Sequence, residues 1–136
     1  MKKLFLISAV IMLGFASCKK DCPEPVQNYN MSGSSWTGTY SIPSVPIANQ
    51  TMNLSFSSTG TITGNVMNGA STFAIAGSWN LVPGSSSVNL FFTIATITGP
   101  YVSQATLTTN NTKLESGVMT NATTPIGNGT FALTRN

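Results

Sequence analysis

From position 36 to the C-terminus, apolar and polar residues alternate with a period of two. The pattern is clearest at 51–57, where Met52, Leu54 and Phe56 are separated by polar residues. Alternation of this kind predicts a β-strand with one buried face and one solvated face. No stretch of helical length carries the apolar spacing of an amphipathic helix, so we expect an all-β domain.

Eight such runs follow one another, separated by short segments rich in Gly, Pro, Asn and Ser. They cover residues 36–42, 51–57, 61–67, 71–82, 87–97, 101–109, 113–119 and 129–134. Asn68-Gly69 is the strongest hairpin signal, because both residue types tolerate the positive φ angles of a tight turn. Residues 43–50 and 121–128 are expected to be longer loops.

Consecutive strands with short connections favour an antiparallel up-and-down meander. Closure into an eight-stranded barrel would remove the exposed edges of a Thr- and Asn-rich sheet, and a β-sandwich is the alternative. The run at 87–97 is apolar on both faces, because Phe91, Ala95 and Ile97 lie opposite its main apolar set. A loop, a partner subunit or a ligand is therefore expected to cover its second face.

The first 35 residues have a different pattern, which predicts an export signal and a tether. Lys2 and Lys3 precede an apolar run at 4–16, which has the length of a secretory signal helix and is too short to span a bilayer. Residues 19–35 contain Pro23, Pro25 and many Ser and Asn, a composition typical of flexible linkers. We expect a cleaved signal helix at 1–17, a tether at 18–35 and a domain at 36–136.

Phe15-Ala16-Ser17-Cys18 resembles the lipobox of bacterial lipoproteins, although Phe15 stands where an aliphatic residue is usual. The resemblance implies cleavage before Cys18 and covalent lipid on that residue, which would hold the protein at the bacterial outer membrane on its periplasmic or its cell-surface side. Cys22 would then be an odd thiol. The alternative is signal cleavage after Ala16, which gives a soluble secreted protein in which Cys18 and Cys22 can form a disulfide.

Charge argues against a nucleic-acid partner. The formal net charge of +3 includes Lys2 and Lys3, which the signal removes, so four Lys and Arg remain against three Asp and Glu. A net charge of about +1 without a basic patch is not typical of a nucleic-acid-binding surface.

The residue inventory argues against catalysis. The sequence contains no His, and residues 36–136 contain no Cys or Asp and one carboxylate side chain, Glu115. A catalytic triad, a pair of carboxylates and the usual metal sites all need residues that this segment lacks. We expect no enzymatic activity, no metal and no cofactor other than the lipid on Cys18.

Four segments in order resemble bacterial lipocalin-like lipoprotein domains: SSWTGTY at 34–40, FSSTGTITG at 56–64, FAIAGSW at 73–79 and GTFALTR at 129–135. The resemblance implies a small calycin-type barrel that binds rather than catalyses. It also implies that Arg135 stacks on Trp36 and closes the barrel floor. Ser34 stands where lipocalins have glycine.

The interior of an eight-stranded barrel is filled by its own side chains or holds one small molecule. Gly38, Gly64 and Gly77 fall in the inward phase, where they either bend the strands or leave room. The aromatic residues expected inside are Tyr40, Phe56, Phe73, Trp79 and Phe92. We expect packing to fill most of the interior and a small apolar ligand to bind near the mouth.

An alternative function is a protein-interaction module. In this hypothesis the barrel is an accessory subunit of an envelope complex or resembles a protease inhibitor. It would bind its protein partner through the loops at 43–50 and 121–128 and through the outer face around Phe91.

Overall fold

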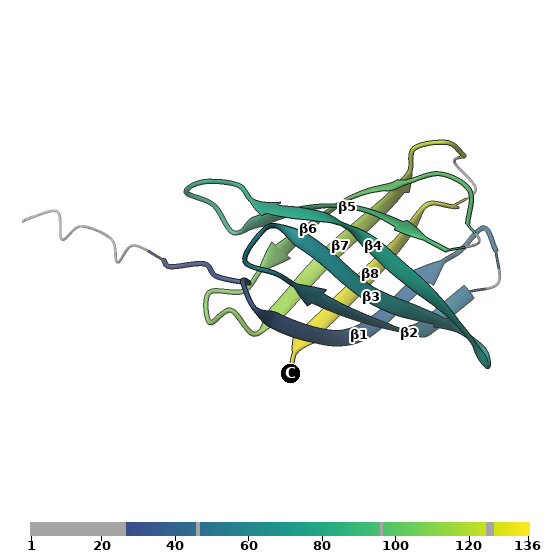
Figure 1. Ribbon diagram of the computed structural model, residues 1–136, viewed down its shortest axis with the longest axis horizontal. Helices are drawn as coiled ribbons and strands as arrows, with labels where there is room; N and C mark the ends of the chain where they lie inside the picture. The colour runs from purple at the N-terminus through teal and green to yellow at the C-terminus, as the bar shows by residue number, and fades with distance from the viewer. Residues whose placement is uncertain (1–26, 46, 96, 125–126) are drawn as a thin grey trace, which may run out of the picture.

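The computed structural model describes residues 27–45, 47–95, 97–124 and 127–136. They form a closed barrel of eight antiparallel strands, in which each strand pairs with its sequence neighbours and β1 also pairs with β8 (Figure 1). The strands are β1 (Ser34–Ile42), β2 (Ile47–Phe56), β3 (Thr61–Asn68), β4 (Ser71–Leu81), β5 (Ser87–Ile94), β6 (Tyr101–Leu107), β7 (Lys113–Asn121) and β8 (Gly129–Arg135). The predicted up-and-down barrel is confirmed, and the sandwich alternative is wrong.

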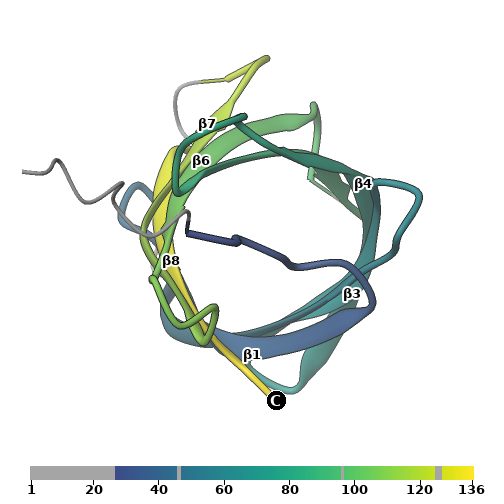
Figure 2. The same ribbon diagram turned by 90° about the vertical axis from the view of Figure 1, so that its left-hand side faces the viewer.

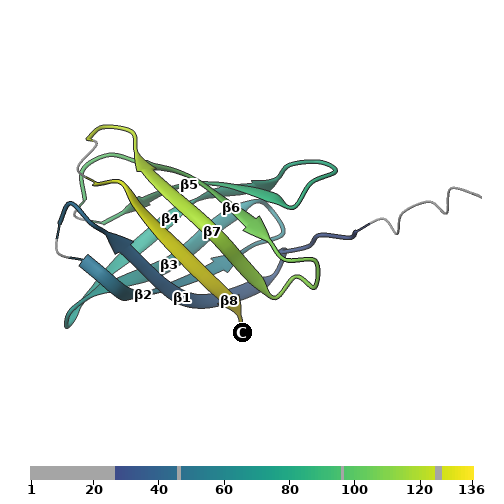
Figure 3. The same cartoon turned by 180° about the vertical axis from the view of Figure 1, so that it is seen from behind.

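Figure 3 shows the closure, with β8 in yellow between β1 and β7. The predicted signal helix, Cys18 and Cys22 lie outside the described residues. Within the described ranges, no helix is long and apolar enough to cross a membrane.

Alternation separates an apolar interior from a polar exterior. In β6, Tyr101, Ser103, Ala105 and Leu107 point inward, and the residues between them are exposed. Burial of one large apolar side chain stabilises the fold by about 1.5–3 kcal/mol. A shift of one residue in any strand would turn its apolar set to water, so the pattern also fixes the register.

The expected loop at 43–50 is wrong in its second half, because β2 begins at Ile47. Ile47 pairs with Ile42 and Gln50 with Tyr40, with a register irregularity between them. Asn49 has a φ of 52° there, and asparagine tolerates this left-handed conformation better than most residues. A bulge of this kind lets the strand continue through residues that do not alternate between apolar and polar.

The strand β5 ends at Ile94, earlier than expected, and Ile97 therefore lies in the β5–β6 connection. There it packs against the core and does not join Phe91 on the outer face. Phe91 is 49% exposed, so no described loop of this chain covers the outer face of β5. Coverage by a partner remains a prediction.

The inward glycines bring neighbouring strands close together. A Cβ atom on Gly38 would collide with the backbone oxygen of Ala132, and one on Gly77 would collide with that of Phe91. Gly64 is placed in the same way against β2. These glycines therefore permit close strand approach at barrel bends and do not leave room for a ligand.

Residues 28–33, here called the floor segment, cross one end of the barrel (Figure 2). Met31 is fully buried at this end. The amide of Gly33 donates to the oxygen of Phe56 over 2.7 Å. The amide of Asn30 donates to Asn111 Oδ1 over 3.0 Å, and Asn111 Nδ2 donates to the oxygen of Asn28 over 3.0 Å. Met31 therefore belongs to the core although it lies in the expected tether at 18–35, and the domain boundary expected at Trp36 stays a prediction.

Candidate functional site

The two ends of the barrel differ, and the closed end is built around Trp36. Its indole Nε1 donates to Ser34 Oγ over 2.7 Å, and the Ser34 hydroxyl donates in turn to the oxygen of Met31. Trp36 and Arg135 lie directly opposite each other in the β1–β8 register. The Arg135 guanidinium donates to the oxygen of Asn30 over 3.4 Å. These bonds attach the floor segment to the barrel, and stacking of Arg135 on Trp36 stays a prediction.

An aromatic cluster fills the closed half above the floor. Phe56 meets Trp36 edge to face with ring centroids 6.2 Å apart, and it meets Trp79 in the same manner at 5.6 Å. The indole of Trp79 donates to the oxygen of Ser57 over 3.2 Å. Edge-to-face contacts of this kind add about 0.5–1.5 kcal/mol to the burial term. Phe56 and Trp79 are therefore core residues of the closed half.

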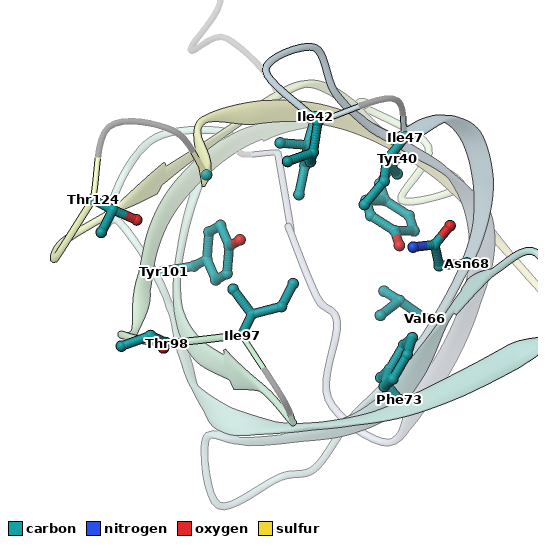
Figure 4. Close-up of a pocket in the computed structure, with 12 residues that line it drawn as sticks. Tyr40, Ile42, Ile47, Val66, Asn68, Phe73, Ile97, Thr98, Tyr101 and Thr124 are labelled. Carbon is teal, nitrogen blue, oxygen red and sulfur yellow. The ribbon is translucent and has the colours of Figure 1, made fainter.

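At the opposite end the barrel contains a cavity of about 540 Å³. Side chains of strand ends and of connections line it, and Figure 4 shows most of them. They include Tyr40, Ile42, Val66, Phe73, Ile97 and Tyr101. Two of the expected ligand-lining residues, Tyr40 and Phe73, therefore lie in the cavity wall.

Phe92, the remaining expected ligand-lining residue, stacks on Tyr101 behind the wall. The ring centroids are 5.5 Å apart and the planes differ by 17°. The sequence reasoning missed Tyr101, because the residues that follow it inward in β6, Ser103 and Ala105, give no apolar signal. Which residues of β6 point inward is instead indicated by its pairing with β5, whose alternation is clear.

Two tyrosine hydroxyls lie in the cavity wall, which also contains the polar residues Asn68, Thr98 and Thr124. Tyr40 donates to the oxygen of Met67 over 2.9 Å. Burial, and to a smaller extent the Tyr101 phenol, raise the pKa of Tyr40 above the ordinary value for tyrosine. The Tyr101 hydroxyl is buried and has no hydrogen-bond partner among the described residues. The Tyr40 phenol is therefore a neutral group in the wall at neutral pH.

The described residues that line the cavity carry no formal charge. An ionic ligand would lose its hydration in this cavity without gaining a counter-ion, which costs far more than the burial of a neutral group. The wall therefore selects for neutral molecules.

Asn121 organises the mouth of the cavity, a role that the sequence reasoning also missed. Its Oδ1 accepts hydrogen bonds from the amides of Thr123 and Thr124, each over 2.9 Å. Its Nδ2 donates to the oxygen of Thr98 over 3.1 Å. Asparagine followed by two threonines is a local signal for such a turn. The buried amide thereby links the β5–β6 connection to the β7–β8 connection.

A second feature lies outside the barrel on β5, β6 and β7. Phe91 is directly opposite Val102, and Val118 lies on β7 opposite the next outward residue of β6. Val102 and Val118 are each 53% exposed. These three residues are here called the outer patch.

Within the described ranges, no group of three or more His, Cys, Asp or Glu side chains is present. The absence of enzymatic activity and of a metal stays a prediction.

Fold and cavity together define a small, closed, eight-stranded antiparallel β-barrel, which is consistent with a lipocalin-like domain. No family model matches the chain, and no curated protein or solved structure matches it either.

Proposed function

We propose that the protein is a lipid-anchored lipoprotein of the bacterial envelope whose barrel binds one small apolar molecule. The observation that carries this proposal is the cavity of about 540 Å³ at one end of the barrel. Ligand sites are typically cavities of about 300–1,000 Å³ with mostly apolar walls and a few convergent polar groups. Tyr40 and Tyr101 are such polar groups, in a wall otherwise dominated by Ile, Val and Phe.

Burial of the ligand supplies the driving force. Removal of about 300 Å² of apolar ligand surface from water yields about 8 kcal/mol before the costs of association. Loss of translational and rotational freedom offsets at least about 4 kcal/mol of it. The difference of about 4 kcal/mol corresponds to a dissociation constant of about 1 mM.

The position of the floor segment supports an orientation for the anchored protein. The described chain enters the barrel at the closed end (Figure 1), and the cavity lies at the opposite end. Asn28 lies ten positions after Cys18, and a fully extended chain of that length spans at most about 35 Å. An anchor at Cys18 would hold the floor near the bilayer and leave the mouth pointing away from it.

The mass of the mature N-terminus tests the anchor. We expect an N-terminal peptide that begins at Cys18 and carries acyl groups, and we expect a Cys18→Ser variant to leave the membrane fraction. An unacylated peptide that begins at Ser17 would contradict the anchor and favour a soluble secreted protein.

Titration with the neutral fluorophore N-phenyl-1-naphthylamine tests the cavity. The wild-type protein should increase its fluorescence saturably. Ile97→Trp, which fills the mouth, should weaken binding at least tenfold. Val102→Ala on the outer patch is the control and should leave binding unchanged. Equal effects of the two variants, or no saturable binding, would contradict the proposal.

A protein-interaction function is the second candidate, and the outer patch favours it. Three large apolar side chains on adjacent strands are about half exposed, and exposed apolar groups that cluster mark interaction sites more often than isolated ones do. A photocrosslinker at Val102 should capture one defined envelope protein if this function is correct. The same crosslinker at Thr37, an exposed position on β1, is the control. If no protein is captured at either position, the interaction function is contradicted and small-ligand binding is the remaining candidate.

A further inference from the structure

We infer that the ligand is a neutral, mostly apolar molecule with one carbonyl or hydroxyl oxygen, and that this oxygen accepts a hydrogen bond from Tyr101. The inference rests on the proposed ligand-binding function and adds the chemical class of the ligand.

The first observation is the hydroxyl of Tyr101. The residue is fully buried, and its oxygen has no hydrogen-bond partner among the described residues. Buried tyrosine hydroxyls are usually hydrogen-bonded, because an unpaired one loses its interaction with water and gains nothing in return. In Figure 4 the hydroxyl points into the cavity from one wall, and Tyr40 lies on the opposite wall.

Packing does not explain this hydroxyl. The ring of Tyr101 stacks on Phe92 with its centroid 5.5 Å away, and a phenylalanine would make the same stacking contact. The polar atom therefore adds a cost to the unliganded barrel without a contact that repays it. A ligand oxygen within the cavity would supply the missing partner.

The two cavity tyrosines differ in what they can still offer a ligand. The Tyr40 proton is engaged with the oxygen of Met67 over 2.9 Å, so its oxygen is left only as an acceptor. The Tyr101 proton is not engaged by any described residue. Of the two tyrosines, Tyr101 alone can thus donate a hydrogen bond to a ligand oxygen, and a hydroxyl ligand can donate back to Tyr40.

Gly127 lies close to this hydroxyl. A Cβ atom at this position would lie 3.1 Å from the Tyr101 oxygen and 2.9 Å from Asn121 Cβ. The β7–β8 connection can therefore pack against Tyr101 and Asn121 only because this position has no side chain. The described lining also carries no charge, which excludes a counter-ion for a carboxylate.

The experiment compares three probes of equal chain length: octan-2-one, octanoate and octane. Each displaces N-phenyl-1-naphthylamine from the mature chain at pH 7.4, and dissociation constants follow from the displacement curves. Water solvates the ketone better than the alkane, so the informative quantity is the ratio of their dissociation constants with and without the Tyr101 hydroxyl. We expect loss of this hydroxyl to change the ratio by about threefold to tenfold against the ketone, the range that one net hydrogen bond provides. Octanoate should bind more weakly than the ketone.

Two variants identify the donor. Tyr101→Phe should weaken ketone binding about threefold to tenfold while it leaves alkane binding unchanged. Ser103→Ala is the matched control, because Ser103 also points inward from β6 and also has a buried, unpartnered hydroxyl, but it does not line the cavity. It should keep the wild-type ratio of ketone to alkane binding.

The outcomes separate the two levels of the proposal. Unchanged ketone binding in Tyr101→Phe, equal weakening of ketone and alkane binding by that variant, or tighter binding of octanoate than of the ketone would each overturn the inference and leave the ligand-binding function in place. Failure of every probe and of the fluorophore would overturn both.

Discussion

The side-chain amide of Asn121 and the backbone carbonyl of Thr98 are joined by a hydrogen bond of 3.1 Å across the mouth of the barrel. Asn121→Ala would break it and would also free the amides of Thr123 and Thr124. We expect a loss of about 2–4 kcal/mol of unfolding free energy, since several polar groups lose their partners at once. Urea denaturation measures it. Asn128→Ala removes one accepted bond at an exposed residue and should cost less, and the reverse order would contradict this role of Asn121.

Removal of a hydroxyl should have opposite effects at the two cavity tyrosines. Tyr40→Phe leaves the oxygen of Met67 without its donor and should lower the unfolding free energy by about 1 kcal/mol. Tyr101→Phe removes an unpartnered buried group, so the unliganded protein should be equally stable or more stable by about 1–3 kcal/mol. Urea titrations of ligand-free protein measure both. Equal destabilisation would show that the Tyr101 hydroxyl has a partner in the unliganded protein.

Stability should fall in alkaline solution through Tyr40. The folded pKa of this phenol lies above its unfolded value of 10.0, so the folded state holds the proton more tightly. The corresponding stability is fully present below pH 10 and is lost as the pH rises through the folded pKa. Urea midpoints from pH 8 to 11.5 should show a steeper decline for wild type than for Tyr40→Phe, and parallel curves would contradict the shift.

The floor segment should be essential to the fold. Met31→Ala removes a fully buried side chain and should cost about 2–4 kcal/mol. Ser32→Ala changes a neighbouring residue whose side chain makes no hydrogen bond to a described residue. This variant should change stability by less than about 0.5 kcal/mol. Thermal melts compare the two. A chain that begins at Trp36 should melt at a lower temperature than one that begins at Gln27. Equal melting temperatures would favour a domain that begins at Trp36.

Two variants of Arg135 distinguish a hydrogen bond from cation–π stacking. Arg135→Ala should lower the unfolding free energy by about 0.5–2 kcal/mol if the guanidinium stacks on Trp36. Arg135→Gln retains a donor for the oxygen of Asn30 without the charge. Retained stability in Arg135→Gln would assign the effect to the hydrogen bond, and an unchanged melting temperature in Arg135→Ala would contradict stacking.

The alternation of polar and apolar residues was sufficient to predict the strands, because each strand has one apolar face. It failed where that local signal is weak. Residues 47–50 do not alternate and follow two prolines, so the start of β2 depends on its pairing with β1. Met31 is an isolated apolar residue in a polar stretch, and its burial is decided by contacts with residues far away in the sequence.

The candidate site was partly predictable for the same reason. Tyr40 and Phe73 are aromatic residues in the inward phase, and this places them inside the barrel. Whether an inward residue fills the closed half or lines the cavity depends on its height along the barrel axis, which follows from strand tilt and stagger. Phe56 and Phe73 therefore have the same inward phase in the sequence pattern, although Phe56 lies in the closed half and Phe73 lines the cavity.

The floor segment has a mechanical consequence. If the chain is anchored at Cys18 as proposed, any tension between membrane and barrel acts first on residues 28–33, whose hydrogen bonds reach β1, β2, β8 and the β6–β7 turn. The load would thus be shared among distant parts of the barrel wall at the end remote from the mouth. The proposed anchor and the proposed ligand site would then lie at opposite ends of the barrel, and a pull on the anchor would act far from the mouth.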